Sequence, residues 1–398
     1  MKLRSTELRI GMFVCELDRP WIETPFLFEG FEIKSQADLE EVQRHCHYVY
    51  VDFSRTQMMP VDMNVSPPGS LWPARSGPSF ASELRTAQTA QKQTSNLVRS
   101  FVDDVKFGTS PDVQLAKDSE AGFVKSILRN PDAMIFMTQM RAKDEGIGQH
   151  AFNTCIYSIV LGRLCGFKPA DLQNLGTCGL LHDVGKIEIP ESLLNKVDPL
   201  TEREMAIIRQ HTVRGRDILM SGRKIYSGTV DVAYGHHEFL DGSGYPRGLI
   251  GDQLNLNCRI VAITEKYDAL MAIRPYRPAR SHLDSIGLLN RMAKRNQLDE
   301  NLVSLFVNYL GIYPPGSLIK LNTNDLAIVL HVNQQSRLKP NVMIIRDAEM
   351  RPVTQFVNLA ENPVNPKGIP YKIKSVHGAH EFDLDLSKYR EIIIQAFD

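Results

Sequence analysis

The feature that most constrains the fold is a series of helical patterns between about residue 120 and residue 312. Apolar residues recur there at helical spacing, and no strand pattern interrupts them. The region is therefore predicted to be an all-helical domain. Helices are expected over 152–167, 170–187, 201–219, 228–239, 257–273, 283–296 and 299–311.

The regions before this series have a different composition. Residues 1–55 are predicted to form a small α+β domain, with a helix over 35–46 and a strand over 48–53. Proline, glycine and serine dominate 56–80, which is typical of a linker. Residues 81–130 are predicted to hold connecting helices. The polar helix near 83–105 either connects domains or forms a dimer, and the sequence leaves both open.

The pattern changes again after Pro314 and Pro315. Short β-rich runs at 317–321, 326–332 and 341–347 are separated by turn residues. We therefore expect a small β-rich module over 313–398, which follows a helical domain placed at 131–312. The predicted fold class is mainly α, with small α+β and β-rich regions at the two ends.

Composition excludes several classes of protein. The 46 basic and 46 acidic side chains cancel, which argues against a partner that is a nucleic acid polymer. No apolar run reaches the length of a membrane span, and the first residues lack the apolar core of a signal peptide. The six cysteines form no CxxC pair, and Cys155, Cys165 and Cys178 have apolar neighbours. A cytoplasmic protein with reduced core thiols is expected.

Five histidines fall within the helical region, and one of them precedes an aspartate in an apolar helix: His150, His182, His211, His236 and His237. Burying the Asp183 carboxylate there is costly unless it is paired or binds a metal. Imidazole nitrogens and carboxylate oxygens suit iron, manganese, cobalt, nickel or zinc. The absence of paired cysteines argues against a structural zinc site.

Adjacent ligands on a helix point roughly 100° apart, so a His-Asp or His-His pair is not expected to bind one ion face-on. Two ions resolve the difficulty, because each member of a pair can address a different metal and an aspartate can bridge both. Two metals roughly 3.5–4 Å apart are a standard arrangement for phosphoester hydrolysis.

The combination "HDVGK", "HHEFLDGSGYP" and "YDALMAIRPYR" resembles the HD-GYP family of the HD phosphohydrolase superfamily over about 145–312. The resemblance implies an all-helical phosphodiesterase of cyclic di-GMP with a bi- or trinuclear centre, commonly of iron or manganese. The N-terminal region, with "LRIGMFVCELDRPWIETPFLFEGF" and "VYVD", is similar to a domain of unknown function that often precedes HD-GYP domains. That second resemblance assigns no activity.

The resemblance also assigns roles residue by residue. Asp183 bridges the metals, and Lys186 contacts a phosphate or stabilises the leaving oxygen. The signature loop Gly244-Tyr245-Pro246 shapes the pocket and contacts partners, while Arg274 and Arg277 pair with the phosphates of the substrate. The implied metal ligands are His150, His182, Asp183, His211, His236, His237 and Glu265.

Two positions depart from the family pattern. Glu265 stands where the family usually has aspartate, so the added methylene must change the metal geometry. Asp268, one turn later, is interpreted as structural rather than as a replacement ligand. Trinuclear members carry a glutamate four residues before the first histidine, where this chain has Gly146. A binuclear centre of iron or manganese is therefore expected.

Three functions are weighed. The first is hydrolysis of cyclic di-GMP to pGpG or GMP, and the second is hydrolysis of another cyclic nucleotide or dinucleotide. The third is a catalytically weak sensor or interaction module, which the intact histidines disfavour. The resemblance also suggests contact of the GYP loop with GGDEF-type or other signalling proteins, and a homodimer.

Overall fold

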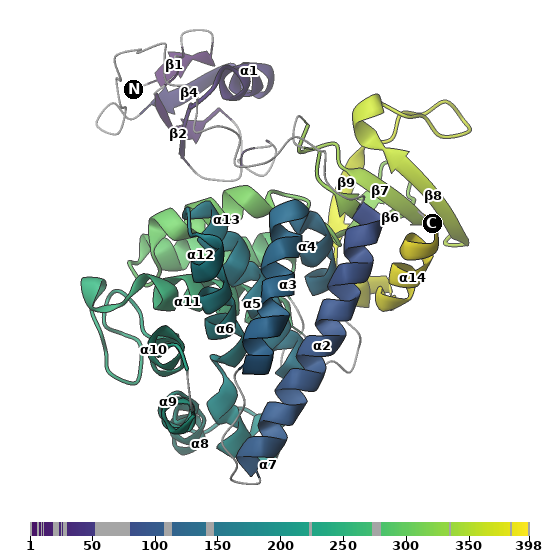
Figure 1. The fold of residues 1–398 in the computed structure, drawn as a ribbon. Helices are drawn as coiled ribbons and strands as arrows, with labels where there is room; N and C mark the ends of the chain where they lie inside the picture. Colours follow the sequence, from purple (N-terminus) through teal and green to yellow (C-terminus); the bar gives the residue numbers. More distant parts are fainter. Residues whose placement is uncertain are drawn as a thin grey trace. The chain divides into compact units, whose positions relative to one another are not determined.

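The computed structural model describes residues 2–5, 8, 10, 12–18, 24, 26, 30–51, 80–106, 114–140, 147–222, 225–272, 280–333, 336–382 and 384–396. The chain forms two compact units, Met1–Pro73 and Ala74–Asp398. The fold confirms the predicted class, because a helical domain is accompanied by a small α+β region and a C-terminal antiparallel sheet (Figure 1).

The first unit contains an antiparallel sheet in the order β1-β4-β2-β3 and one helix, α1 (Gln36–His45). Its strands are β1 (Lys2–Arg4), β2 (Phe13–Leu17), β3 (Phe31–Glu32) and β4 (Tyr48–Val51). Helix α1 starts at a capping box, in which Ser35 and Asp38 satisfy each other's backbone amides. Val42 of the helix and Val14 and Val49 of the strands form part of the buried core of this unit.

The second unit is built on helices whose central members are apolar on almost every side. Residues 151–162 of α5 are all buried, as is most of α11, so these two helices occupy the middle of the domain. The helices are α2 (Phe80–Lys106), α3 (Gln114–Arg129), α4 (Pro131–Gln139), α5 (Ile147–Leu164), α6 (Pro169–Leu181), α7 (Glu191–Leu194), α8 (Glu202–Arg209), α9 (His211–Ser221), α10 (Ser227–Gly235), α11 (Leu256–Met271), α12 (His282–Lys294) and α13 (Glu300–Leu310).

Two predicted helices end well before the residues that the sequence pattern indicated, and a third is divided in two. The helix expected over 170–187 ends at Leu181, and a 3-10 helix, η3 (Val184–Glu188), follows it. The helix expected over 201–219 is two helices, α8 and α9, which meet at Gln210. The helix expected over 228–239 ends at Gly235. Apolar periodicity continued through these ends because the residues beyond them are also buried.

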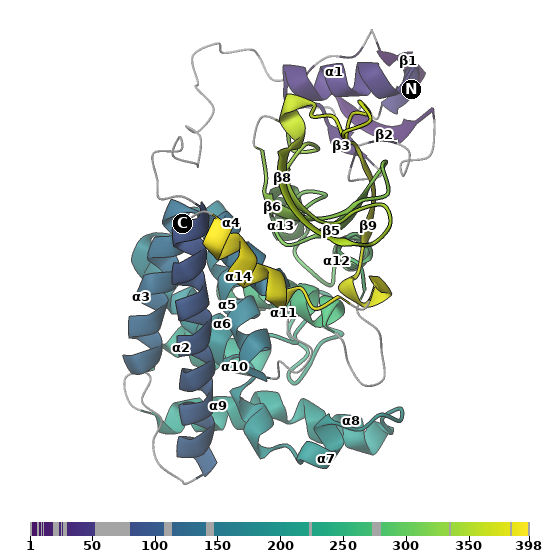
Figure 2. The ribbon, with the colours of Figure 1, turned by 90° about the vertical axis from the view of Figure 1, so that its right-hand side faces the viewer.

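The C-terminal part forms a five-stranded antiparallel sheet in the order β8-β7-β6-β5-β9. Its strands are β5 (Leu318–Leu321), β6 (Leu326–His331), β7 (Asn341–Arg346), β8 (Pro352–Asn358) and β9 (Ile373–His377). Sequence analysis did not anticipate the final helix, α14 (Ser387–Ala396), which lies beside α2 (Figure 2). Arg390 on α14 donates to the Oε1 of Gln91 on α2 at 3.1 Å.

Two expectations from composition can be compared with the fold. In the described part of the chain, none of the helices combines the length and the apolar character needed to cross a membrane. All six cysteines are free thiols. Cys155 and Cys178 are buried as expected, whereas Cys165 is only half-buried because it lies at the end of α5.

A buried histidine outside the metal-ligand set makes folding sensitive to pH. The Nε2 of His282 donates to the carbonyl of Gly311 at 2.8 Å, so its Nδ1 accepts from the hydroxyl of Tyr267 at 2.8 Å. Burial lowers the pKa of His282 to about 4, although the bond to Gly311 opposes that shift. The imidazole is therefore neutral in the folded protein.

We predict that His282 stabilises the fold above pH 6.5 and that this contribution is lost as pH falls toward 4. The unfolded chain takes up a proton in that window while the folded chain does not, which costs roughly 3 kcal/mol at most. Urea unfolding of the wild type and of His282→Gln between pH 7.5 and 4 tests this. The free-energy difference between the two proteins should shrink as pH falls, and a constant difference would contradict the prediction.

Candidate metal centre

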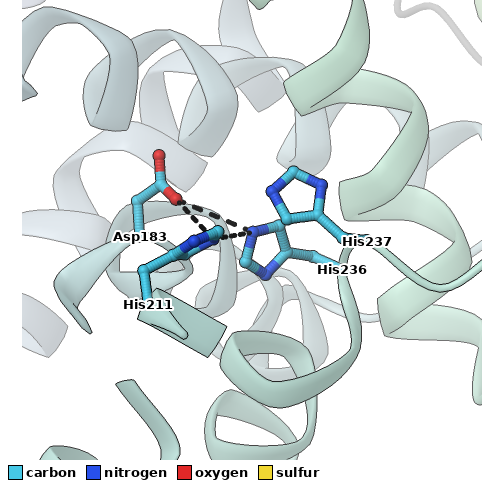
Figure 3. Close-up of side chains that lie close together, drawn as sticks. All are labelled: Asp183, His211, His236 and His237. Carbon is cyan, nitrogen blue, oxygen red and sulfur yellow. Dashed lines mark hydrogen bonds and ion pairs between the residues drawn. The ribbon is translucent and has the colours of Figure 1, made fainter. Parts of the chain in front are cut away.

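The predicted ligands come from five separate elements that meet inside the helical domain. His150 lies on α5, and Glu265 lies on α11. His182 and Asp183 link α6 to η3, and His211 is the first residue of α9. The pair at 236 and 237 follows α10. Figure 3 shows four of these side chains close together: Asp183, His211, His236 and His237.

Asp183 lies at the centre of the cluster, with its two oxygens directed to different histidines. Its Oδ2 is 3.5 Å from the Nε2 of His150 and 3.3 Å from that of His182. Its Oδ1 is 3.4 Å from the Nε2 of His211 and 3.7 Å from that of His236. Two potential metal-binding groups therefore share this carboxylate: Asp183, His150 and His182 in one, and Asp183, His211, His236 and His237 in the other.

Four of the histidines have the same hydrogen-bonding pattern, in which Nδ1 contacts an oxygen behind the ring. The contacts are His182 to Gly179 O at 2.8 Å, His211 to Ile208 O at 2.7 Å, His236 to Val232 O at 3.0 Å, and His150 to Asp268 Oδ2 at 2.7 Å. Because a carbonyl or carboxylate only accepts, these contacts place the proton on Nδ1. Each Nε2 is then left with a lone pair directed toward Asp183, as metal-ligating imidazoles require.

Several buried polar atoms of the cluster lack a hydrogen-bond partner among the described residues. They are His150 Nε2, His182 Nε2, Asp183 Oδ1 and Glu265 Oε2. In addition, the Nε2 atoms of His211 and His236 face each other at 3.3 Å. Lone pairs that approach so closely repel each other unless a cation lies between or beside them. The nitrogen and oxygen donors therefore fit a divalent metal.

A close backbone contact brings Asp183 next to His211. Gly185 in η3 packs against α9 so tightly that a Cβ there would lie 1.9 Å from the carbonyl oxygen of His211 and 2.4 Å from the amide nitrogen of Gly215. Only glycine allows this approach. The end of α6 at Leu181 and the tighter η3 turn thus direct the carboxylate toward α9.

The electrostatics of the cluster favour cation binding at neutral pH. Burial alone would raise the pKa of Asp183, but the Lys186 ammonium and His182 hold it well below its ordinary value. Burial lowers the pKa of His211 to about 4. The pKa of His237 is also lowered, by burial and by the neighbouring His236 and His211. The centre therefore contains an ionised carboxylate, and the imidazoles of His211 and His237 are neutral near pH 7.

Glu265 lies near the cluster but outside both metal-binding groups. Its side chain is buried, and the Nζ of Lys266 lies 3.9 Å from its Oε2. Burial would raise its pKa, but Lys266, His150 and His236 lower it. Sequence analysis overlooked Lys266, whose side chain is 26% exposed next to the centre.

The structure gives Asp268 a definite role. Its carboxylate is completely buried, and it accepts from His150 at 2.7 Å and from the Nδ2 of Asn153 at 2.8 Å. The sequence interpretation of Asp268 as a structural residue agrees with these contacts, which direct it to His150. The sequence showed an aspartate one turn after Glu265 on α11. It did not show that its partner is His150 on α5, because the two residues are 118 positions apart.

The histidine pair differs from the sequence expectation. His236 and His237 fall in the same metal-binding group, although one ion for each had been predicted. The prediction assumed that the two side chains diverge too widely to bind one ion. Helix α10 ends at Gly235, and His236 is its C-cap.

The signature loop folds back onto the histidine pair. The amide of Tyr245 donates to the carbonyl of His237 at 3.1 Å, and the two rings lie 4.8 Å apart. A Cβ on Gly244 would lie 2.3 Å from the amide nitrogen of Phe239, so only glycine fits there. Arg209, which sequence analysis did not single out, lies over the Tyr245 ring at 5.0 Å.

Lys186 and the remaining predicted site residues complete the description. The Nζ of Lys186 pairs directly with Asp183 Oδ2 across one turn of η3, not along an α-helix. Pro246 is exposed beside Tyr245. Arg274, Arg277 and Gly146 lie outside the described residues.

Two family models and several known proteins match this chain. The family model described as HD domain matches residues 135–302, and the model described as domain of unknown function (DUF3391) matches residues 1–116. Cyclic di-GMP phosphodiesterase PA4108 of Pseudomonas aeruginosa is 33% identical over 366 residues, which cover 89% of this chain and 88% of that protein.

Two further relatives match this chain over a shorter length. Cyclic di-GMP phosphodiesterase response regulator RpfG of Xanthomonas campestris is 41% identical over 116 residues, which cover 29% of this chain and 30% of that protein. A 3'3'-cGAMP-specific phosphodiesterase 2 of Vibrio cholerae is 37% identical over 139 residues, which cover 35% and 27%.

The HD domain and the buried histidine–aspartate groups define an HD-domain protein with a centre suited to divalent metal. Within that class, the chain belongs to the HD-GYP family, and a DUF3391 domain precedes its HD domain.

Asp268→Asn should weaken metal binding without unfolding the domain. Asparagine can satisfy only one of the two N–H donors that meet at this buried position, so His150 loses its fixed orientation. Loss of such a supporting partner typically lowers metal affinity by about 10- to 100-fold. Titration with Mn²⁺, with the exposed Asp171→Asn as control, measures this. Wild-type affinity in Asp268→Asn would contradict the assigned role.

Proposed function

We propose that this chain is a metal-dependent phosphodiesterase that hydrolyses cyclic di-GMP to pGpG or GMP in bacterial second-messenger signalling. The observation that carries the proposal is the shared Asp183 carboxylate, which lies between inward-facing histidine nitrogens. This centre occurs in a chain that matches a cyclic di-GMP phosphodiesterase over 89% of its length.

The proposed cofactors are two divalent ions, iron or manganese, bridged by Asp183. The proposed ligands are His150, His182, Asp183, His211, His236, His237 and Glu265. Nitrogen–oxygen shells with open positions suit these metals. When bound, a pair of such ions activates water and stabilises charge on a reacting phosphate. A third ion would need a further carboxylate near His150, and Gly146 has no side chain to supply one.

The chain's own side chains are proposed to bind and orient the substrate. Lys186, 23% exposed and paired with Asp183, is placed to hold a phosphate oxygen next to the centre. Lys266 offers a second ammonium on the α11 side. Gly244, Tyr245 and Pro246 would border the substrate. Arg274 and Arg277 are proposed, from the sequence alone, to pair with its phosphates.

A second substrate, 3'3'-cGAMP, has a specific observation in its favour. Relatives named for that activity match parts of this chain at 37% and 32% identity. Both cyclic dinucleotides present two phosphodiesters to the metal centre, so the choice between them depends on contacts to one base. Cyclic di-GMP is preferred because a relative named for it matches 89% of the chain.

Partners and compartment are also proposed. Contact of the GYP loop with GGDEF-type or other signalling proteins, and a homodimer, are inferred from the family resemblance. A cytoplasmic location is supported by the six free thiols, because a reducing compartment keeps cysteines unpaired.

Incubation of the purified, manganese-loaded protein with each dinucleotide tests the proposal. Chromatography of the products should show cyclic di-GMP converted to pGpG or GMP, with slower conversion of 3'3'-cGAMP. Faster conversion of 3'3'-cGAMP would reassign the substrate. Absence of hydrolysis of both, in protein shown to contain metal, would support a sensor or interaction module instead.

Asp183→Ala should abolish hydrolysis, with a fall of at least about 1000-fold in kcat, because one side chain contributes to both metal groups. The helical content should persist, since the apolar faces of α5, α6 and α11 are unchanged. Asp198→Ala, at an exposed position, is the matched control. Turnover at the wild-type rate in Asp183→Ala would refute the bridging role.

A further inference from the structure

The residue immediately after the histidine pair is a completely buried carboxylate. Glu238 is 0% exposed, and its closest cation contact is the Nε of Arg247 at 3.9 Å. Its oxygens instead accept two backbone amides, with Oε1 2.6 Å from the nitrogen of Arg247 and Oε2 3.0 Å from that of Leu249. Glu238 thus binds the backbone of the GYP loop, here defined as residues 239–250.

The amides of Arg247 and Leu249 lie just after the Gly244-Tyr245-Pro246 turn. The base of the loop is closed independently, because Asp241 pairs with Ile250 and the amide of Gly251 donates to Leu240 O at 3.0 Å. The carboxylate of Glu238 therefore fixes the returning half of the loop, not its base. With that half fixed, Tyr245 is held against His237.

His237 needs such support more than the other histidines do. His150, His182, His211 and His236 are oriented by hydrogen bonds from Nδ1. No ring hydrogen bond joins His237 to any described residue, and its imidazole is instead packed between aromatic rings. The centroids of His236, Tyr245 and His211 lie 4.1, 4.8 and 5.1 Å from that of His237.

We propose that Glu238 is a positioning residue for the metal centre: it holds the GYP loop closed, so that Tyr245 keeps the His237 imidazole directed toward the metal. The inference rests on the proposed metal-binding role of His237. This role explains why the histidine pair, the glutamate and the glycine–tyrosine–proline turn occur as one motif. The turn orients the His237 ring, whereas hydrogen bonds from Nδ1 orient the other four histidines.

Glu238→Gln tests the inference with an almost isosteric change. The amide group of glutamine can accept only one of the two backbone N–H groups, and its own NH₂ would face the other. Hydrogen exchange of the amides at 247 and 249 should accelerate at least about 10-fold, and affinity for Mn²⁺ should fall about 10-fold or more, the size expected for a supporting partner. Exchange in α5 should remain unchanged, which shows that the domain is folded.

Two further variants separate the steps of the argument. Tyr245→Leu should lower Mn²⁺ affinity to a similar degree while the amide of Leu249 stays protected, because the carboxylate contact remains. Arg247→Ala keeps the backbone amide and removes only the guanidinium, so both measurements should match the wild type. Should Glu238→Gln fail to fold, Tyr245→Leu still tests the role of the ring on His237.

Wild-type Mn²⁺ affinity in Tyr245→Leu would overturn the inference, as would accelerated exchange with unchanged affinity in Glu238→Gln. Both readouts are independent of substrate. Weakened metal binding in these variants, in a protein that does not hydrolyse cyclic di-GMP, would therefore support the inference and reject the proposed function.

Discussion

The candidate site depends on a single buried carboxylate. Asp183 is 5% exposed, and the imidazoles around it direct lone pairs, not protons, toward its oxygens. An interior that gathers acceptors in this way is unfavourable unless cations compensate. Lys186 supplies one positive charge, yet buried nitrogens and oxygens of the cluster still lack partners among the described residues. Divalent metal is the compensation that fits all of these atoms.

The helical scaffold provides the rigidity that this arrangement needs. Helices α5 and α11 are buried on nearly all sides, so His150 and Asp268 are fixed relative to each other. Gly179 allows α6 to approach the backbone of α5, where a Cβ would lie 2.9 Å from Cys155 Cα. Gly185 allows the same closeness between η3 and α9. Two glycine contacts thus determine where Asp183 lies.

The sequence was sufficient for the fold class and for the chemical character of the site. Helical periodicity located the domain, and the histidine and aspartate motifs identified side chains that meet in space, such as His150 and Asp183. It did not reveal where helices end, because residues past Leu181 and Gly235 are still buried.

Residues that act through tertiary contacts were also beyond the sequence. Asp268 contacts a histidine 118 positions earlier, and Glu238 binds amides 9 and 11 residues later through a loop closure that no periodicity describes. Both carboxylates, Asp268 and Glu238, lie within the sequence motifs, but their hydrogen-bond partners became evident only from the structure. The same holds for α14, whose polar contacts with α2 join residues about 300 positions apart.

The central claim is that one carboxylate lies between two metal ions. Anomalous diffraction from crystals of the manganese-loaded protein tests it most directly. The account predicts two peaks roughly 3.5–4 Å apart, each within about 2.0–2.3 Å of a different oxygen of Asp183. A single peak bound by histidines alone, or two peaks of which neither contacts Asp183, would contradict it.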